Sequence, residues 1–437
     1  MKGDFSRWTF DPSKHYGRVL SLQGRVFLDA DSNEAHELQL WHLRKLMQDL
    51  IGPHAGPGTG FEITPVQGDF SIAAGSYYVN GILCENDTLA SYLKQPFLPK
   101  PEALSNGSFI AYLDVWERLV TYIEDEDRSP AELGQTIREV ALGGPDTAAR
   151  SQVVWQVRLL PFVSASPPTN DEKSYQAFLK QLKDTRVVRT SVGKLKARAR
   201  KPKGADQPCP TNPDSRYRGP ENQLYRVEVH NKGIFLADGS GAPKATFKWS
   251  RENGSVVFPI RSIEGATVTL ETLGRDERLG LKPGDLVEVV DDRYVLENRA
   301  EPLLTVKSMD PETFVVELGS APASSVGSDP KDHPILRRWE GTAEVSRNPD
   351  PATDGYLTLE QGVEIYFNEG EYRTGDYWIM PARTATGDVE WPGPATDPQL
   401  VEPHGIVHGY APLAYLAVTG GSVTVALMRR SITVLWK

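Results

Sequence analysis

Two histidines four residues apart, His404 and His408, are candidate metal ligands. At this spacing two imidazoles could bind zinc from one face of a helix, and in a strand they would also share one face because side chains alternate there. The intervening glycine and the flanking Pro403 and Gly409 favour a loop or strand, and the two cysteines of the chain are isolated, so no third ligand is assignable. The alternative is a pair of packed or interface histidines. We therefore predict no metal and no cofactor.

Three pairs of neighbouring residues set a carboxylate beside an indole, as sugar sites often do. They are Trp116-Glu117, Trp339-Glu340 and Glu390-Trp391. The alternative is that each indole packs in a core or an interface and each acid faces solvent. These pairs motivate a second functional hypothesis, a carbohydrate-binding or carbohydrate-active protein of the cell wall.

The acidic stretch at 29–34, DADSNE, resembles the start of a calcium-binding loop. Glu34 stands where such a loop needs glycine, and Leu40 stands where it needs glutamate. The alternative is a helix start, with Asp31 as the cap and Glu34 completing a capping-box-like pair. The helix should then run to about Leu50, with an apolar stripe at Leu40, Leu43, Met47 and Leu50 that Leu38, Trp41 and Leu46 widen.

Composition excludes several classes of protein. The formal charge of −10 disfavours a general nucleic-acid binder. The phosphate-loop, HExxH and GxSxG motifs do not occur, so we predict that the protein is not an enzyme and has no catalytic residues. The first residues lack the apolar core of a signal peptide, and no run is long and apolar enough for a membrane helix. We expect synthesis and folding in the cytoplasm.

The N-terminal residues form an arm rich in aromatic and basic side chains. Large aromatics contribute little unless they are buried, so they either fold back onto the core of the protein or dock on a neighbour. Accompanying arginines suit the polar rim of an interface. A short apolar strand is predicted at 24–28, between the arm and the helix. The predicted assembly residues are Phe5, Arg7, Trp8, Phe10, Tyr16 and Arg18.

The remaining pattern predicts a mainly β protein with several small antiparallel barrel or sandwich domains behind the arm and helix. Short β-rich runs alternate with Gly, Pro and Asn turns throughout. The predicted segments are the arm and helix (1–60), a β-rich domain (61–165), a helical and basic insertion (166–222), a small β-barrel-like domain (223–325) and a C-terminal β-rich domain (326–437).

The insertion combines an amphipathic helix with a basic run. The helix is marked by Tyr175, Phe178, Leu179 and Leu182, and the run spans 186–203. Basic runs can bind nucleic acid or anionic lipid, but this one lacks the interleaved aromatics that stack on bases. We favour a flexible loop that pairs with an acidic neighbour.

Several blocks together resemble a known family. They are MKGDFSRWTFDPSKHY, QGRVFLDADSNE, YLDVWER, IREVALGGPDT, VVWQVR, YRGPENQLYRVEVHNKG, FKWSRENGSVV, YRTGDYWIMPARTATGDVEWP and PHGIVHGYAPLAYL. The chain resembles an uncharacterised bacterial domain family found in loci of phage-tail-like contractile injection systems, where it also stands before fibre-like β-helical segments. No catalytic motif is carried over from that family.

This resemblance implies a structural subunit at the periphery of the baseplate, such as a cage or extension component. Its partners would be other subunits of the particle, including further copies of the chain, with no nucleic acid and at most indirect membrane contact. The subunit would reside in an assembled particle, either membrane-associated or released.

Overall fold

The computed structural model describes residues 1–125, 137–142, 146–164, 167–188, 192–200, 217–394 and 396–433. Strands account for 38% of the residues and helices for 15%, which confirms the predicted mainly β class with several separate sheets. The chain divides into two compact units. Unit 1 consists of Met1–Trp8, Leu119–Arg150 and Ser191–Gly405, and unit 2 consists of Thr9–Arg118, Ser151–Thr190 and Ile406–Lys437.

Each unit collects stretches that lie far apart in the sequence, unlike the five consecutive segments expected above. One long pairing in unit 2 joins β25 (Gly409–Thr419) to β7 (Gly107–Val120), with Gly409 opposite Val115. Such non-local antiparallel pairs leave no mark in the spacing of residues along the chain. The division into units therefore follows strand pairing rather than linker composition.

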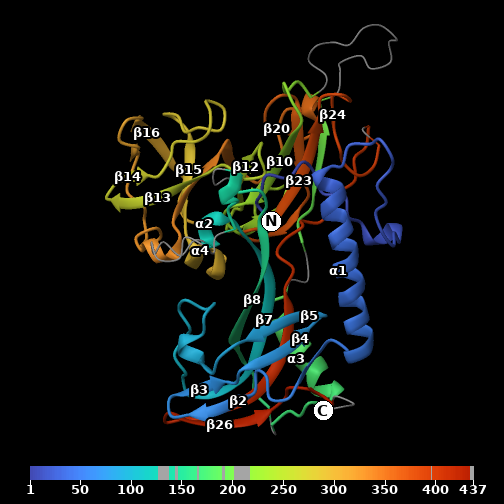
Figure 1. The fold of residues 1–437 in the computed structure, drawn as a ribbon, viewed down its shortest axis with the longest axis vertical. Coiled ribbons are helices and arrows are strands. Elements are labelled where there is room, and N and C mark those ends of the chain that lie inside the picture. Colours follow the sequence, from blue (N-terminus) through green and yellow to red (C-terminus); the bar gives the residue numbers. More distant parts are fainter. Residues whose placement is uncertain are drawn as a thin grey trace. The chain divides into compact units, whose positions relative to one another are not determined.

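Unit 2 contains three sheets around one apolar core (Figure 1). The largest has the order β26-β25-β7-β8, with β26 at Ser422–Leu427 and β8 at Arg150–Pro161. The second has the order β27-β1-β4-β5, formed by Ser431–Ile432, His54–Pro57, Gly75–Val79 and Ile82–Asn86. The third joins β2 (Ile63–Val66), β3 (Asp69–Ile72) and β6 (Ala90–Ser91), and the short helices η1 and η2 span Pro12–Lys14 and Tyr92–Lys94.

Asn80 and Gly81 form the turn between β4 and β5, and Asn-Gly is a typical residue pair of a tight hairpin turn. Both residues have positive φ, 49° and 78°, as a tight two-residue hairpin requires. A Cβ on Gly81 would lie 2.4 Å from the carbonyl oxygen of Arg44 in helix α1 (Asp29–Ile51). The glycine thus allows the hairpin to pack closely against the helix.

Helix α1 forms as predicted, but its start differs. Leu28 is the N-cap, and its backbone N–H donates to Asp31 Oδ2 at 3.3 Å. Glu34 does not complete a capping box and instead accepts a hydrogen bond from the Thr9 hydroxyl at 2.5 Å. The predicted strand at 24–28 is wrong because this stretch pairs with no strand among the described residues and remains extended coil.

The second predicted helix is confirmed as α3 (Glu172–Asp184). Asp171 caps it by accepting from the Ser174 N–H at 2.7 Å. Its residues Phe178 and Leu182 are fully buried in a small core with Tyr112. The 3.6-residue period predicted this element because the whole helix packs through one face.

Unit 1 is built on a five-stranded sheet with the order β19-β12-β10-β23-β24. These strands span Gly341–Glu344, Thr246–Ser250, Gln223–Val229, Tyr377–Arg383 and Asp388–Val389. The middle strand β10 is buried at every residue, as expected for a strand covered on both faces. Smaller sheets join β20 (Leu357–Thr358), β21 (Val363–Phe367) and β9 (Leu195–Ala199), and β11 (Gly233–Phe235) with β22 (Gly370–Tyr372).

A closed barrel of six strands forms the other part of unit 1. Its order is β13 (Val257–Glu264), β14 (Thr267–Leu270), β17 (Val315–Leu318), β16 (Leu304–Asp310), β15 (Leu286–Val290) and β18 (Ile335–Trp339). Strand β18 closes the ring by pairing with both β15 and β13. A small barrel was expected at 223–325, but the closing strand comes from beyond that segment, while β10 and β12 belong to the five-stranded sheet.

The basic run is partly a strand rather than a flexible loop. Residues 195–199 form β9, which pairs with β21. Arg198 Nε lies 3.0 Å from Glu364, so the expected acidic partner belongs to the same chain. Residues 189–191 and 201–216 lie outside the described residues. The short helices of unit 1 are α2 (Tyr122–Asp125), α4 (Asp292–Glu297), η3 (Val140–Leu142), η4 (Pro330–Asp332) and η5 (Pro351–Thr353).

Candidate functional site

The first three residues are held inside unit 1 through their backbone. The Met1 carbonyl accepts hydrogen bonds from Arg226 Nη1 at 3.2 Å and from Asn253 Nδ2 at 3.3 Å. The same Asn253 amide donates to the Gly3 carbonyl at 2.9 Å. Gly3 is buried, and a Cβ there would lie 2.7 Å from the ring of Phe5. This segment is therefore a fixed part of the unit 1 fold.

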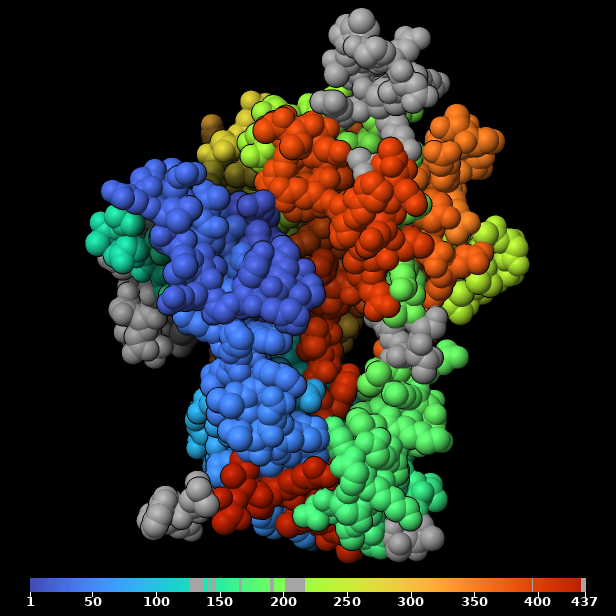
Figure 2. Space-filling model, turned by 90° about the vertical axis from the view of Figure 1, so that its right-hand side faces the viewer, coloured from blue at the N-terminus to red at the C-terminus, as the bar shows by residue number. Residues whose placement is uncertain are grey.

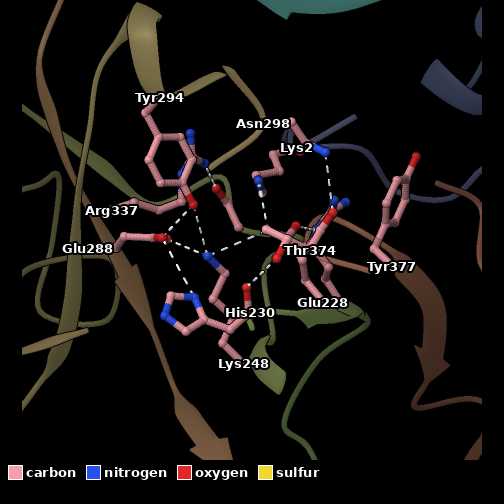
Figure 3. Close-up of polar contacts among 12 residues, drawn as sticks. Lys2, Glu228, His230, Lys248, Glu288, Tyr294, Asn298, Arg337, Thr374 and Tyr377 are labelled. Carbon is pink, nitrogen blue, oxygen red and sulfur yellow. Dashed lines mark hydrogen bonds and ion pairs between the residues drawn. The ribbon is translucent and has the colours of Figure 1, made fainter. Parts of the chain in front are cut away.

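Lys2 enters a buried charged cluster, shown in Figure 3. Its Nζ lies 2.9 Å from Glu228 on β10, and Arg226 Nε lies 2.7 Å from the same carboxylate. Lys248 on β12 bridges Glu228 at 3.6 Å and Glu288 of barrel strand β15 at 2.5 Å. The cluster thus joins the N-terminal residues, the five-stranded sheet and the barrel within unit 1.

The second carboxylate of the cluster also has neutral donors. Glu288 accepts from the Tyr294 hydroxyl at 2.5 Å and from Trp339 Nε1 at 3.0 Å. Lys248 and Glu288 are each only 1% exposed. Buried charges are tolerated when their partners saturate them, and this network meets that condition. The network therefore serves to hold the buried parts of unit 1 together.

Burial and charge set the protonation of this cluster. Burial opposes ionisation of Glu228, but Lys2, Arg226 and Lys248 outweigh it and hold the pKa of this carboxyl well below its usual range. Burial lowers the pKa of Lys2 to about 8. Burial, reinforced by Lys248, lowers the pKa of His230 to about 4, so its imidazole is neutral at pH 7.

Two surface hollows adjoin the cluster. One of about 350 Å³ includes His230, Asn231, Thr246, Glu301 and Thr342 in its wall. The other, of about 500 Å³, is lined by Arg251, Glu277, Arg278, Lys282, Gly284, Asp285, Leu286, Arg338, Trp339 and Glu340. Within the described part of the chain, no group of three His, Cys, Asp or Glu side chains is arranged to hold a metal ion.

The six predicted assembly residues do not form one free arm. Phe5, Arg7 and Trp8 belong to unit 1, where the Phe5 and Trp8 rings meet edge to face at 5.7 Å and Arg7 pairs with Glu390 at 3.3 Å. Phe10, Tyr16 and Arg18 belong to unit 2. Phe10 is half-buried, whereas Tyr16 and Arg18 are exposed. The first part of the arm therefore folds back onto its own chain, whereas Tyr16 and Arg18 stay exposed.

The most exposed apolar side chains near the N-terminus follow this arm. Leu20 and Leu22 are each 65% exposed, Val26 is 82% exposed and Phe27 is 59% exposed. We call residues 16–28 the apolar segment. The sequence prediction placed residues 24–28 of this segment in a short apolar strand and did not predict its exposure. Figure 2 shows the blue N-terminal residues, this segment and α1 among them, at the surface.

Helix α1 has a second exposed apolar surface. Among its residues only Ala30 and Leu38 are buried. Leu43, Leu46 and Leu50, predicted as part of its packing stripe, are between 52% and 71% exposed. The spacing predicted the helix correctly, but within the described residues these three leucines are not packed as the stripe predicted.

The other candidate residues have structural partners. His404 belongs to unit 1 and its ring lies against Tyr377, whereas His408 belongs to unit 2 and contacts Asp114 at 2.6 Å. Each of the two histidines therefore packs against its own partner.

The Trp–acid pairs are also accounted for by packing and ion pairs. The indoles of Trp116 and Trp339 are buried. The three acids do not simply face solvent. Glu117 pairs with Arg44, Glu340 with Arg338 and Glu390 with Arg383.

The geometry defines a mainly β protein of several antiparallel sheets, with an internal charged cluster and an exposed apolar N-terminal segment. The chain belongs to the family of unknown function DUF6519, whose model matches residues 1–174 and 162–426. Searches of curated proteins and of solved structures found no match. No helix in the described ranges combines the length and apolar composition needed to cross a membrane.

Proposed function

We propose that this protein is a structural subunit of a phage-tail-like contractile injection system. It would act by protein–protein assembly at the periphery of the baseplate, as a cage or extension component. Its location would be the assembled particle, and its partners would be the neighbouring subunits. The proposal involves no catalytic step.

The exposed apolar segment carries this proposal. Leu20, Leu22, Val26 and Phe27 present apolar side chains to solvent next to the exposed leucines of α1 in the sequence. A group of exposed large apolar side chains in one stretch of the chain favours a protein–protein interaction site. An assembled particle provides the permanent burial that such side chains favour.

Two further observations support an assembly role. Residues 1–3 are held inside unit 1 by backbone hydrogen bonds, so the start of the chain is a fixed part of the fold. The carboxylates of the buried cluster are saturated by cations and neutral donors, which suits a rigid building block better than an acid–base site. The sequence blocks that resemble the injection-system family support the choice of particle.

The test uses substitutions because deletion of the whole arm would also remove Lys2 from its cluster. The triple variant Leu20→Ser, Leu22→Ser, Val26→Ser is expressed in place of the wild-type chain in cells that produce the particle. Its side chains are exposed, so we expect the thermal midpoint of the purified protein to change by less than about 2 °C. The amount that co-purifies with particles should fall at least about tenfold.

A matched control replaces exposed apolar residues elsewhere in unit 2. Leu89 and Val163 are 71% and 95% exposed, so Leu89→Ser, Val163→Ser removes comparable apolar surface. This control should enter particles in wild-type amount. Normal incorporation of the triple variant would refute the assembly role of the apolar segment.

A further inference from the structure

The surface hollow that contains His230 is built from two parts of unit 1. His230 and Asn231 directly follow strand β10. Thr246 begins β12, and Thr342 lies on β19 of the same sheet. The rest of the wall is residues 300–303, which lead from α4 into barrel strand β16. The volume of about 350 Å³ falls within the range of small-molecule pockets, roughly 300–1,000 Å³, so the hollow has room for one small ligand.

The imidazole of His230 is a buried polar group in this wall, only 5% exposed. Its Nδ1 lies 3.8 Å from Glu288 Oε1 and is sealed from solvent without a hydrogen bond. Its Nε2 points away from the charged cluster and has no hydrogen-bond partner among the described residues (Figure 3). Because burial and Lys248 lower its pKa to about 4, the ring is neutral at pH 7, with one N–H and one bare nitrogen. The carboxylate of Glu288 favours the N–H at Nδ1, which leaves Nε2 as an acceptor.

The neighbouring polar groups are also mainly acceptors. The Thr342 hydroxyl donates to the Phe247 carbonyl at 2.8 Å, so its oxygen can only accept from a ligand. Thr246 Oγ1 accepts from the backbone N–H of Asn231 at 3.2 Å and from its side-chain amide at 3.1 Å. The hydrogen of that hydroxyl and Asn231 Oδ1 remain for a ligand, and Glu301 adds a carboxylate. The hollow therefore offers several acceptors and one hydroxyl donor.

The charges around the hollow favour a neutral ligand. An anion would find no lysine or arginine among the described residues of the wall. A cation would find Glu301 already paired with Arg299 at 3.6 Å. The surroundings also lower the pKa of His230, so they disfavour positive charge at this point. A ligand that brings hydrogen-bond donors without net charge fits these conditions.

A small ring or chain of hydroxyl-bearing carbons meets them, because each hydroxyl both donates and accepts and the C–H groups can pack on apolar side chains. Ala300, Pro302 and Leu303 supply apolar surface in the wall. We propose that this hollow binds a neutral, polyhydroxylated ligand of the size of one sugar unit, whose hydroxyl groups donate to His230 Nε2 and Asn231 Oδ1. The inference adds a ligand to the proposed subunit and does not depend on the assembly role.

The first experiment measures sugar binding to the purified chain by saturation-transfer NMR. The probes are D-glucose, D-galactose, D-mannose and N-acetyl-D-glucosamine. We expect saturable binding of at least one of them, with a dissociation constant below about 10 mM. The charge controls D-glucosamine and D-glucuronate carry an ammonium or a carboxylate on the same ring and should bind at least about tenfold more weakly.

Two outcomes of this experiment would overturn the proposal. One is the lack of saturable binding of any of the four sugars up to about 50 mM. The other is tighter binding of a charged control than of its neutral parent sugar. The disaccharide of the sugar that binds then identifies the source of the ligand. A hollow for the terminal unit of a glycan binds the disaccharide at least as tightly, whereas a hollow for a free sugar excludes it, and both results support the site.

The second experiment tests whether the sugar occupies the hollow. His230→Phe keeps an aromatic ring but has no acceptor, so we expect the dissociation constant of the sugar to rise at least about tenfold. His230→Gln retains an acceptor oxygen and should weaken binding less. His54→Phe is the matched control, because it replaces another buried imidazole that does not line the hollow, and it should leave the constant unchanged.

Asn231→Ala keeps the proposal testable if His230→Phe does not fold. The Asn231 side chain is exposed, so its removal should leave the fold intact and raise the dissociation constant at least about threefold. Constants that stay unchanged in every folded variant of His230 and Asn231 would place the sugar elsewhere on the chain and would overturn the proposal.

Discussion

The ammonium group of Lys2 lies 2.9 Å from the carboxylate of Glu228, a residue buried in the middle strand of the unit 1 sheet. This contact anchors the start of the chain by charge as well as by backbone hydrogen bonds. Glu228 also binds Arg226 and Lys248, and its three cations lie at different distances from the carboxylate. We therefore expect them to contribute unequally to the stability of unit 1. The cost of losing each partner should differ accordingly.

Substitution of the carboxylate should destabilise unit 1 more than substitution of the lysine. Glu228→Gln leaves Lys2, Arg226 and Lys248 without their shared counter-ion, and we expect a loss of about 3–5 kcal/mol in the free energy of unfolding. Lys2→Met leaves Glu228 with two cations and should cost about 1–2 kcal/mol. Urea unfolding at pH 7 measures both. Equal losses would contradict the shared role of Glu228.

Lys248 and Glu288 should behave as a coupled pair. They lie 2.5 Å apart and are nearly inaccessible to solvent. Lys248→Met alone leaves a buried carboxylate short of its cation and should cost about 3–5 kcal/mol. The double variant Lys248→Met, Glu288→Gln removes both charges and should be more stable than Lys248→Met. A double variant whose loss equals the sum of the two single losses would exclude coupling.

Two buried histidines should make the protein sensitive to acid. Burial, assisted by Arg430 for His54 and by Lys248 for His230, lowers both pKa values from 6.5 to about 4. Between these pH values the unfolded chain binds a proton that the folded chain does not, so stability is full above pH 6.5 and falls as pH decreases toward 4. Each imidazole contributes about 3 kcal/mol to this loss.

The phenylalanine variants test this pH dependence. The double variant His54→Phe, His230→Phe replaces each imidazole with an aromatic ring that does not titrate. Urea midpoints measured from pH 7 to pH 4 should therefore decline less steeply in the variant than in the wild type. Parallel pH curves for the two proteins would show that other groups dominate the acid sensitivity.

The hairpin turn against α1 gives a steric prediction with an internal control. Gly81→Ala would place a Cβ 2.4 Å from the Arg44 carbonyl at φ 78°, so backbone must move. Gly68 has a similar φ of 73° with open space around it. We expect Gly68→Ala to cost about 1 kcal/mol from conformation alone and Gly81→Ala to cost at least about 2 kcal/mol more. Equal unfolding midpoints would refute the packing role of Gly81.

Local patterns predicted the elements that local forces determine. Residues Phe178 and Leu182 repeat with the helical period, and Asn80-Gly81 has the two residues that a tight turn requires, so both features were predictable from the sequence. The mainly β class follows from the same short-range signals. The start of α1 differed because Glu34 binds Thr9, a partner that the capping pattern does not include.

The candidate site was less predictable. Residues 24–28 have the composition of an apolar strand, and composition cannot tell whether a partner strand exists in the same chain. Lys2 and Glu228 are separated by more than two hundred residues, and charged residues in a β-rich run are more often solvent-exposed. That Arg226 and Glu228 lie in a strand buried at every residue became evident only from the structure.

The sequence by itself determined the β-rich class, the two long helices, the tight hairpin and the aromatic and basic character of the arm, because these depend on backbone propensity and side-chain period over a few residues. Tertiary structure alone decided that β18 closes the barrel, that Lys2 neutralises Glu228 and that the leucines of the apolar segment and α1 stay exposed. The physical reason is that pairing, burial and charge compensation depend on which distant residues share a neighbourhood, and only the folded chain sets those distances.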